Sequence, residues 1–170
     1  FQGFAHWMKD KYLDNGSKLI EVGSNDGTLL ENFKNMNIEA IGFEPSKTIA
    51  ELANKKSIKT LDKFFNTQNI EDIKNFHSSV DVICSANVIA HIPDLKDVIK
   101  CVDQLLSSKG LLIFEEPYLG SMFSKVSYDQ IYDEHIFMFS VSSIKKIFDL
   151  FDFELVDVLP QVTHGGSMRY

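Results

Sequence analysis

Short apolar runs alternate with amphipathic segments along most of the chain. The runs are typical of buried strands, and the segments between them repeat their apolar side chains at helical spacing. This alternation predicts an α/β fold with a mostly parallel, doubly wound sheet that has helices on both faces. Strands are expected at 18–22, 38–43, 57–61, 80–85, 111–115 and 153–159, and helices at 27–36, 46–55, 94–106 and 142–150.

Composition and charge limit the class of protein. A chain of 170 residues, 44% of them hydrophobic, can bury one sizeable core. We expect an N-terminal lead-in helix over 1–17 and one domain over 18–170. The net charge of −7 would repel a phosphate backbone, and no stripe of Lys and Arg offsets it. A nucleic-acid partner is therefore not expected.

Cysteine usage and hydropathy bear on the location of the protein. Cys84 and Cys101 fall in a predicted strand and a predicted helix, and no C-x-x-C pair is present. Both are expected to be reduced core residues of a cytoplasmic protein. No apolar run approaches the roughly 20 residues that span a bilayer, so no membrane segment is expected.

The most informative segment is 19–27, where an apolar strand runs into a glycine turn that begins a predicted helix. Gly23 and Gly27 allow a ligand to approach the backbone, and the helix start is expected to present free N–H groups. Asn25 replaces the second glycine of the dinucleotide fingerprint, and Glu21 precedes the turn. A cofactor without a pyrophosphate tolerates such a turn. The alternative is an ordinary strand-to-helix turn of an α/β protein.

A carboxylate stands at the end of the second predicted strand, about 20 residues after Gly23, where an acidic side chain can bind a ribose diol. Glu44 is therefore the predicted ribose ligand. The alternative is an acidic residue that only stabilises the start of the next helix. The predicted cofactor contacts are Glu21, Gly23, Ser24, Asn25, Gly27, Glu44, Pro45 and Asn87.

Two further segments carry polar residues suited to catalysis. Asn87 and His91 are four residues apart after the fourth predicted strand, so one helical turn over Ala86 to Ala90 would direct both to one cleft. His91 could equally be an ordinary loop histidine. Later, Tyr132 and His135 lie three apart with Glu134 between them, a set suited to proton transfer near neutral pH. The alternative there is a solvated acidic turn followed by core aromatic residues.

Six motifs together resemble the sugar C-methyltransferase family, in order and in spacing. The resemblance implies a Rossmann-like, class I methyltransferase fold, with S-adenosylmethionine as cofactor and S-adenosylhomocysteine as product. Members of the family methylate nucleotide-linked keto-deoxysugars, so the implied partner is a small-molecule nucleotide-sugar. The motifs are Gly23-Ser24-Asn25-Asp26-Gly27-Thr28-Leu29-Leu30, Gly42-Phe43-Glu44-Pro45-Ser46, Ala90-His91-Ile92-Pro93-Asp94, Glu116-Pro117-Tyr118, Ile131-Tyr132-Asp133-Glu134-His135 and Thr163-His164-Gly165-Gly166-Ser167-Met168-Arg169.

The resemblance implies a protein of three parts, and this chain is similar only to the central methyltransferase part. Zinc cysteines and the C-terminal Rossmann-like part are absent, and the start without Met suggests a domain cut from a longer protein. The oligomeric state is left open, with a monomer allowed.

The resemblance also implies roles for single residues. His135 is similar to the catalytic base, with Tyr132, Glu134 and His91 as active-site companions, and Asn87 lies between cofactor and sugar. Many relatives have a His at the position of Asp133, but that His is not the one assigned the chemistry. No metal is required. The alternatives are an O- or N-methyltransferase of another small molecule, and a non-catalytic cofactor-binding module.

Overall fold

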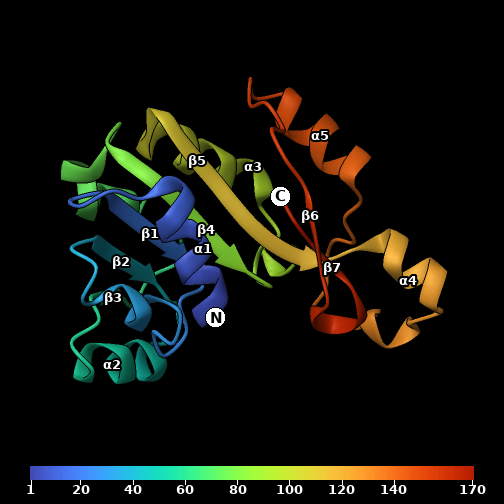
Figure 1. The fold of residues 1–170 in the computed structure, drawn as a ribbon, viewed down its shortest axis with the longest axis horizontal. Helices are drawn as coiled ribbons and strands as arrows, with labels where there is room; N and C mark the ends of the chain where they lie inside the picture. Colours follow the sequence, from blue (N-terminus) through green and yellow to red (C-terminus); the bar gives the residue numbers. More distant parts are fainter. The chain divides into compact units, whose positions relative to one another are not determined.

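The computed structural model describes all residues of the chain, 1–170, and divides it into two compact units (Figure 1). The first unit comprises Phe1–Ser85 and Lys100–Leu112, and the second comprises Ala86–Ile99 and Ile113–Tyr170. Helix α3 (Leu95–Leu105) and strand β5 (Leu106–Pro117) continue from one unit into the other. The hydrogen-bonded strand order is β3-β2-β1-β4-β5-β7-β6. The predicted α/β class is confirmed.

Parallel strands form the core of the first unit. β1 (Lys18–Val22) pairs in parallel with β2 (Glu39–Phe43) and with β4 (Val80–Ala86), and β2 pairs in parallel with the short β3 (Thr60–Leu61). Largely apolar runs permit this burial, because strands of a parallel sheet are covered on both faces. Three isoleucines at adjacent register positions of β2, β1 and β4 are fully buried, namely Ile41, Ile20 and Ile83.

Two helices of the first unit bury small or apolar residues. Helix α1 (Gln2–Tyr12) buries Ala5 and Met8 without any exposed area, and α2 (Lys47–Lys55) buries Ala53 in the same way. No helix of the chain is long and apolar enough to cross a membrane.

The prediction of a helix over 27–36 is wrong. The structure has turns there and a short 3-10 helix, η1 (Leu30–Phe33), and a second 3-10 helix, η2 (Ile70–Phe76), lies before β4. The side-chain amide of Asn32 donates to the carbonyl oxygens of Thr28 and Leu29, at 3.0 Å each. Asparagine side chains bond readily to nearby backbone groups in this way, and this lowers their preference for an α-helix.

The second unit is built on antiparallel pairing. The end of β5 pairs with β7 (Ser167–Arg169), which pairs with β6 (Leu159–Gln161). Glu115 of β5 and Arg169 of β7 form a largely buried ion pair of 2.9 Å. The helices of this unit are α4 (Leu119–Lys125), α5 (Val141–Asp149), and the 3-10 turns η3 (Ile89–His91), η4 (Tyr128–Gln130) and η5 (Thr163–Gly165).

The strand expected over 153–159 is wrong in all but its last residue. Residues 153–158 have no strand partner, and β6 occupies Leu159–Gln161. Its partner β7 spans only three residues, with Leu159 opposite Arg169 and Gln161 opposite Ser167. A strand exists only where a neighbour pairs with it, so the length of β7 limits the length of β6.

Both cysteines are buried in the structure. Cys84 lies in β4 and Cys101 in α3, and each is a free thiol. This confirms the expectation that both are core residues, and their reduced state stays a prediction. The cytoplasmic location and the division into residues 1–17 and 18–170 stay predictions.

Candidate functional site

The glycine turn after β1 adopts a left-handed backbone at three of its residues. The φ angles are 70° at Gly23, 50° at Asn25 and 81° at Gly27. Asparagine is one of the few residues with a Cβ that tolerate this region, which explains how Asn25 replaces a glycine. At Gly27 a Cβ would also lie 2.7 Å from Ile58, so this position requires glycine both for its φ and for the close approach.

The prediction of free N–H groups at this turn is wrong. Gly23 and Ser24 both donate to the carbonyl of Phe43, at 2.8 and 3.0 Å, and Gly27 donates to the carbonyl of Ser24 at 3.0 Å. Asn25 donates to Glu44, at 3.2 Å. These amides already have acceptors within the turn or at the end of β2, because β2 ends directly beside the turn. A pyrophosphate would need those donors, so the turn is poorly suited to a dinucleotide.

Glu44 is held by backbone amides from two directions. Its Oε2 accepts from Asn25 N at 3.2 Å and its Oε1 accepts from Ser46 N at 2.8 Å. Each carboxylate oxygen can accept more than one hydrogen bond, so both retain capacity for an external donor. Pro45 beside it is exposed. The side chain is thereby fixed at the end of β2 and only partly covered.

Two buried polar groups lie next to the turn. Glu21 is 4% exposed and its Oε2 has no hydrogen-bond partner, and Ser24 is 2% exposed with an unpartnered hydroxyl. Burial, with a smaller contribution from Asp26, raises the pKa of the Glu21 carboxyl well above its usual value. Sequence reasoning assigned no role to Gly42, where a Cβ would lie 2.2 Å from the Ser24 hydroxyl. Glycine at this position of β2 makes room for Ser24.

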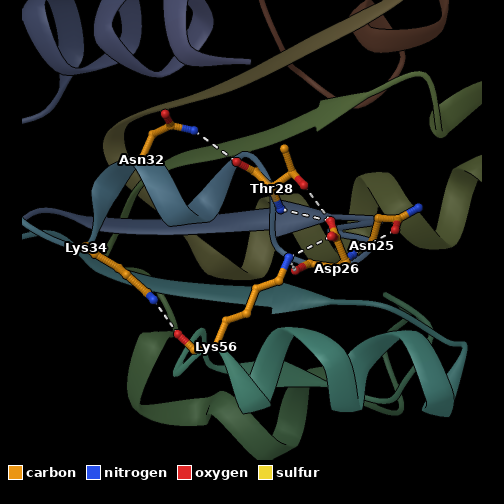
Figure 2. A network of polar contacts seen from close by, with 6 residues as sticks. All are labelled: Asn25, Asp26, Thr28, Asn32, Lys34 and Lys56. Atoms are coloured by element: carbon orange, nitrogen blue, oxygen red, sulfur yellow. Dashed lines mark hydrogen bonds and ion pairs between the residues drawn. The ribbon is translucent and has the colours of Figure 1, made fainter.

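A network of polar contacts fastens the turn to the end of α2 (Figure 2). Lys56 Nζ lies 2.7 Å from Asp26 Oδ2, and the Thr28 hydroxyl donates to Asp26 Oδ1 at 2.6 Å. Lys34 donates to the carbonyl oxygen of Lys56. Hydrogen bonds from Lys56 and then Thr28 lower the pKa of the Asp26 carboxyl. Figure 2 shows Asp26 between Thr28 and Lys56, so one carboxylate joins the turn to α2.

Replacing Lys56 by methionine tests this network. Lys56→Met is expected to raise the Asp26 pKa towards its usual value and to lower the free energy of unfolding at pH 7 by about 0.2–1 kcal/mol, because the pair is partly exposed. A depressed folded-state pKa adds stability that is present above the unfolded pKa and lost as pH falls through the folded one. The difference between variant and wild type should therefore shrink in acid.

The measurements are an NMR titration of the Asp26 carboxyl and chemical denaturation at several pH values. Lys55→Met is the matched control, because Lys55 is an exposed neighbour on α2, whereas the ion pair with Asp26 is made by Lys56. An Asp26 pKa that is the same in Lys56→Met and in wild type would contradict the assignment.

Tyr132 and His135 of the second unit meet in one exposed turn. The Tyr132 hydroxyl lies 2.9 Å from His135 Nε2, and the Gln130 carbonyl oxygen lies 2.8 Å from His135 Nδ1. A carbonyl oxygen can only accept, so Nδ1 carries the hydrogen and Nε2 of the neutral ring holds the lone pair. Tyr132 is 46% exposed. The basic nitrogen of His135 therefore lies at an accessible tyrosine hydroxyl.

His91 lies beside His135, but the backbone that places it there is not the expected helical turn. Its ring centroid lies 4.9 Å from that of His135. The single helical turn expected over Ala86 to Ala90 is wrong: Asn87 has a φ of 59° and η3 begins at Ile89. The buried Asn87 Oδ1 has no partner. Asn87 belongs to the second unit, whereas the other predicted cofactor contacts belong to the first.

Glu134 does not orient the imidazole in this structure. Its side chain is exposed, and the contact at His135 Nδ1 is made by the Gln130 carbonyl oxygen. Sequence reasoning missed this contact because a main-chain oxygen has no signature in the sequence. No group of three or more His, Cys, Asp and Glu side chains is placed to hold a metal ion.

Glu116, at the end of β5, has no separate role in the sequence analysis. It is fully buried, and its Oε1 accepts from the amides of Val88 and Ile89 at 2.9 and 2.6 Å. Burial raises the pKa of its carboxyl to about 7, against the lowering effect of these hydrogen bonds. The Glu116-Pro117-Tyr118 motif is the sequence feature that could have indicated a role for Glu116, because an acidic residue inside a buried strand needs a partner.

Comparison with known proteins identifies the relatives of the chain. A family model described as a methyltransferase domain matches residues 5–158. C-methyltransferase NovU of Streptomyces niveus is 32% identical over 92% of this chain and 37% of NovU. The mitochondrial ubiquinone biosynthesis O-methyltransferase of Bos taurus is 30% identical over 57% of this chain and 28% of that enzyme. The crystal structure of YcgJ from Bacillus subtilis gives a TM-score of 0.74 at 14% identity, over 95% of this chain and 73% of that one.

The family model and the fold identify a Rossmann-like, class I methyltransferase domain, which belongs to an S-adenosylmethionine-dependent class. The chain belongs to the methyltransferase-domain family, since that model covers most of its length. The predicted fold, enzyme class and cofactor are thereby confirmed. The chain spans well under half of each of the two curated relatives.

Proposed function

We propose that the protein methylates a carbon atom next to the ketone of a nucleotide-linked keto-deoxysugar. The observation that carries this proposal is the His135 ring, whose Nδ1 hydrogen is held by a backbone carbonyl and whose Nε2 faces the Tyr132 hydroxyl. Carbon methylation requires a base, because a C–H bond must be broken before the carbon can act as a nucleophile. The similarity to a C-methyltransferase supports the same reaction.

The residues of the first unit fit the cofactor. The Glu44 carboxylate is fixed by two amides with accepting capacity left for a ribose diol, and the unpartnered, buried Glu21 Oε2 suits the ammonium of an amino-acid moiety. An ammonium would restore the charge that burial disfavours on Glu21. When bound, S-adenosylmethionine supplies a methyl group that is already electrophilic.

His135 Nε2 accepts the proton from the carbon beside the ketone, and the electron pair of the broken C–H bond forms an enolate. The Tyr132 hydroxyl turns from Nε2 to the enolate oxygen and donates a hydrogen bond to it, with His91 as a second donor. The Gln130 carbonyl stabilises the imidazolium through its Nδ1 hydrogen. The enolate carbon would then be the nucleophile for the methyl group that S-adenosylmethionine would supply, with S-adenosylhomocysteine as the product.

Solvent exchange tests this reaction directly. A thymidine diphosphate-linked keto-deoxysugar is incubated with the protein in deuterium oxide, with S-adenosylhomocysteine in place of the methyl donor. Deuterium should enter the carbon beside the ketone, because proton abstraction can proceed without transfer. An O- or N-methyltransferase would show no exchange, and a non-catalytic module would show neither exchange nor turnover with S-adenosylmethionine.

Glu44 gives a second test, which concerns the cofactor alone. Glu44→Ala is expected to weaken S-adenosylmethionine and S-adenosylhomocysteine binding about 10- to 100-fold, since hydrogen bonds to a charged acceptor are lost. Titration calorimetry with both compounds and with NAD measures this. Glu51→Ala is the control, because Glu51 is an exposed glutamate on α2. Tighter binding of NAD, or indifference to Glu44→Ala, would overturn these contacts.

A further inference from the structure

Glu116 fixes the backbone of the turn that follows β4. A single carboxylate oxygen, Oε1, accepts from two successive amides, Val88 at 2.9 Å and Ile89 at 2.6 Å. The Glu116 side chain has no exposed area and its bond to Ile89 is buried, whereas its bond to Val88 is partly buried. A buried amide without a partner costs free energy comparable to a lost hydrogen bond. Glu116 therefore holds two successive amides of the turn with a single oxygen.

The same turn holds the segment that carries His135. The carbonyl oxygen of Ala90 accepts from Ile136 N at 2.9 Å and from Phe137 N at 3.2 Å. His91, the next residue, packs its ring against that of His135 at 4.9 Å. The turn thus contacts the ring of His135 through His91. Through the Ala90 carbonyl it also holds the two amides that follow His135. All of these residues belong to the second unit.

We propose that Glu116 is a positioning residue for His135 and acts through the turn at residues 88–91. The role assigned to His135 rests on the proposed function, whereas the structural connection does not. Glu116 does not need to touch the substrate. Its Oε1 sets the position of Ala90, and Ala90 sets the backbone next to the imidazole. A displacement of about 1 Å at a reacting group can lower a rate about 10²-fold.

Hydrogen exchange of single amides, measured by NMR, tests the connection without a substrate. Glu116→Leu should speed exchange at least about tenfold at Val88 and Ile89, and also at Ile136 and Phe137, because losing one hydrogen bond shifts an opening equilibrium by about that factor. Glu116→Gln should keep all four amides near wild type, since its side-chain oxygen can still accept.

The reference amides and the control variant both involve residues of β5. Phe114 and Tyr170 bond reciprocally through their backbones and report opening of the whole unit. Glu115→Gln alters the neighbouring residue, whose carboxylate binds Arg169 and Thr163 instead of the turn. Fast exchange of Val88 and Ile89 with unchanged Ile136 and Phe137 in Glu116→Leu would overturn the proposal.

A wild-type measurement keeps the proposal testable if Glu116→Leu does not fold. The amides of Val88, Ile89, Ile136 and Phe137 should open together, with one dependence on denaturant concentration, because they belong to one connected element. Different denaturant slopes for the two pairs of amides would contradict the connection.

The kinetic test uses deuterium exchange into the keto-deoxysugar. Glu116→Leu should lower the exchange rate constant about 10²-fold with little change in KM, and Glu116→Gln should restore it to near wild type. A lower rate in both variants would indicate that the charge is needed, which would overturn a positioning role. If the wild type shows no exchange into the sugar, the proposed function fails, whereas the amide measurements still decide whether Glu116 positions His135.

Discussion

His135→Asn is expected to lower turnover by about 10²–10⁴, the usual contribution of a positioned general base. Asparagine retains a group that can donate to the Gln130 carbonyl, but it has no nitrogen that can accept a proton near neutral pH. Affinity for S-adenosylmethionine should stay nearly unchanged, because Gly23 and Glu44 belong to the first unit and His135 to the second.

Turnover, calorimetry and solvent deuterium exchange in the same variant separate these effects. Exchange into the carbon beside the ketone should disappear in His135→Asn and persist in His6→Asn, a control on an exposed histidine of α1. Exchange that continues at the wild-type rate in His135→Asn would show that another group is the base. His91 and Tyr132 would then be the candidates, since both rings contact His135.

Glu116→Gln is expected to change how stability depends on pH. Burial raises the Glu116 pKa to about 7 in the folded protein, so the fold binds this proton more tightly than the unfolded chain does. A raised folded-state pKa adds stability that is fully present below the unfolded pKa and is lost as pH rises through the folded one. The wild type should therefore lose about 2–3 kcal/mol of unfolding free energy between pH 5 and pH 8 through this group.

The glutamine variant has no proton to lose at this position, so its stability should fall less over the same range. Denaturant unfolding of both proteins at several pH values measures the difference, which should grow with pH in favour of Glu116→Gln. Glu115→Gln is again the control, because that carboxylate is paired with Arg169. Parallel pH profiles for wild type and Glu116→Gln would show that Glu116 does not titrate in this range.

The sequence alone determined the class of fold and the location of the glycine turn after β1. Buried parallel strands are largely apolar, and amphipathic helices show helical periodicity. The sequence therefore predicts β1, β2, β4, α2, α3 and α5 within a few residues of their observed bounds. The turn after β1 and the carboxylate after β2 were likewise readable, because a left-handed turn and a strand-end acid depend on residue type.

Only the tertiary structure decided features that depend on distant partners or on backbone atoms. Leu159–Gln161 forms a strand because β7 pairs with it, and Leu30–Phe33 forms a short 3-10 helix where a longer α-helix was expected. The tautomer of His135 follows from the Gln130 carbonyl, and the turn beside it follows from buried Glu116. A main-chain oxygen is the same in every residue, and a buried acid acquires its partners only on folding, so neither contact could be predicted from the order of side chains.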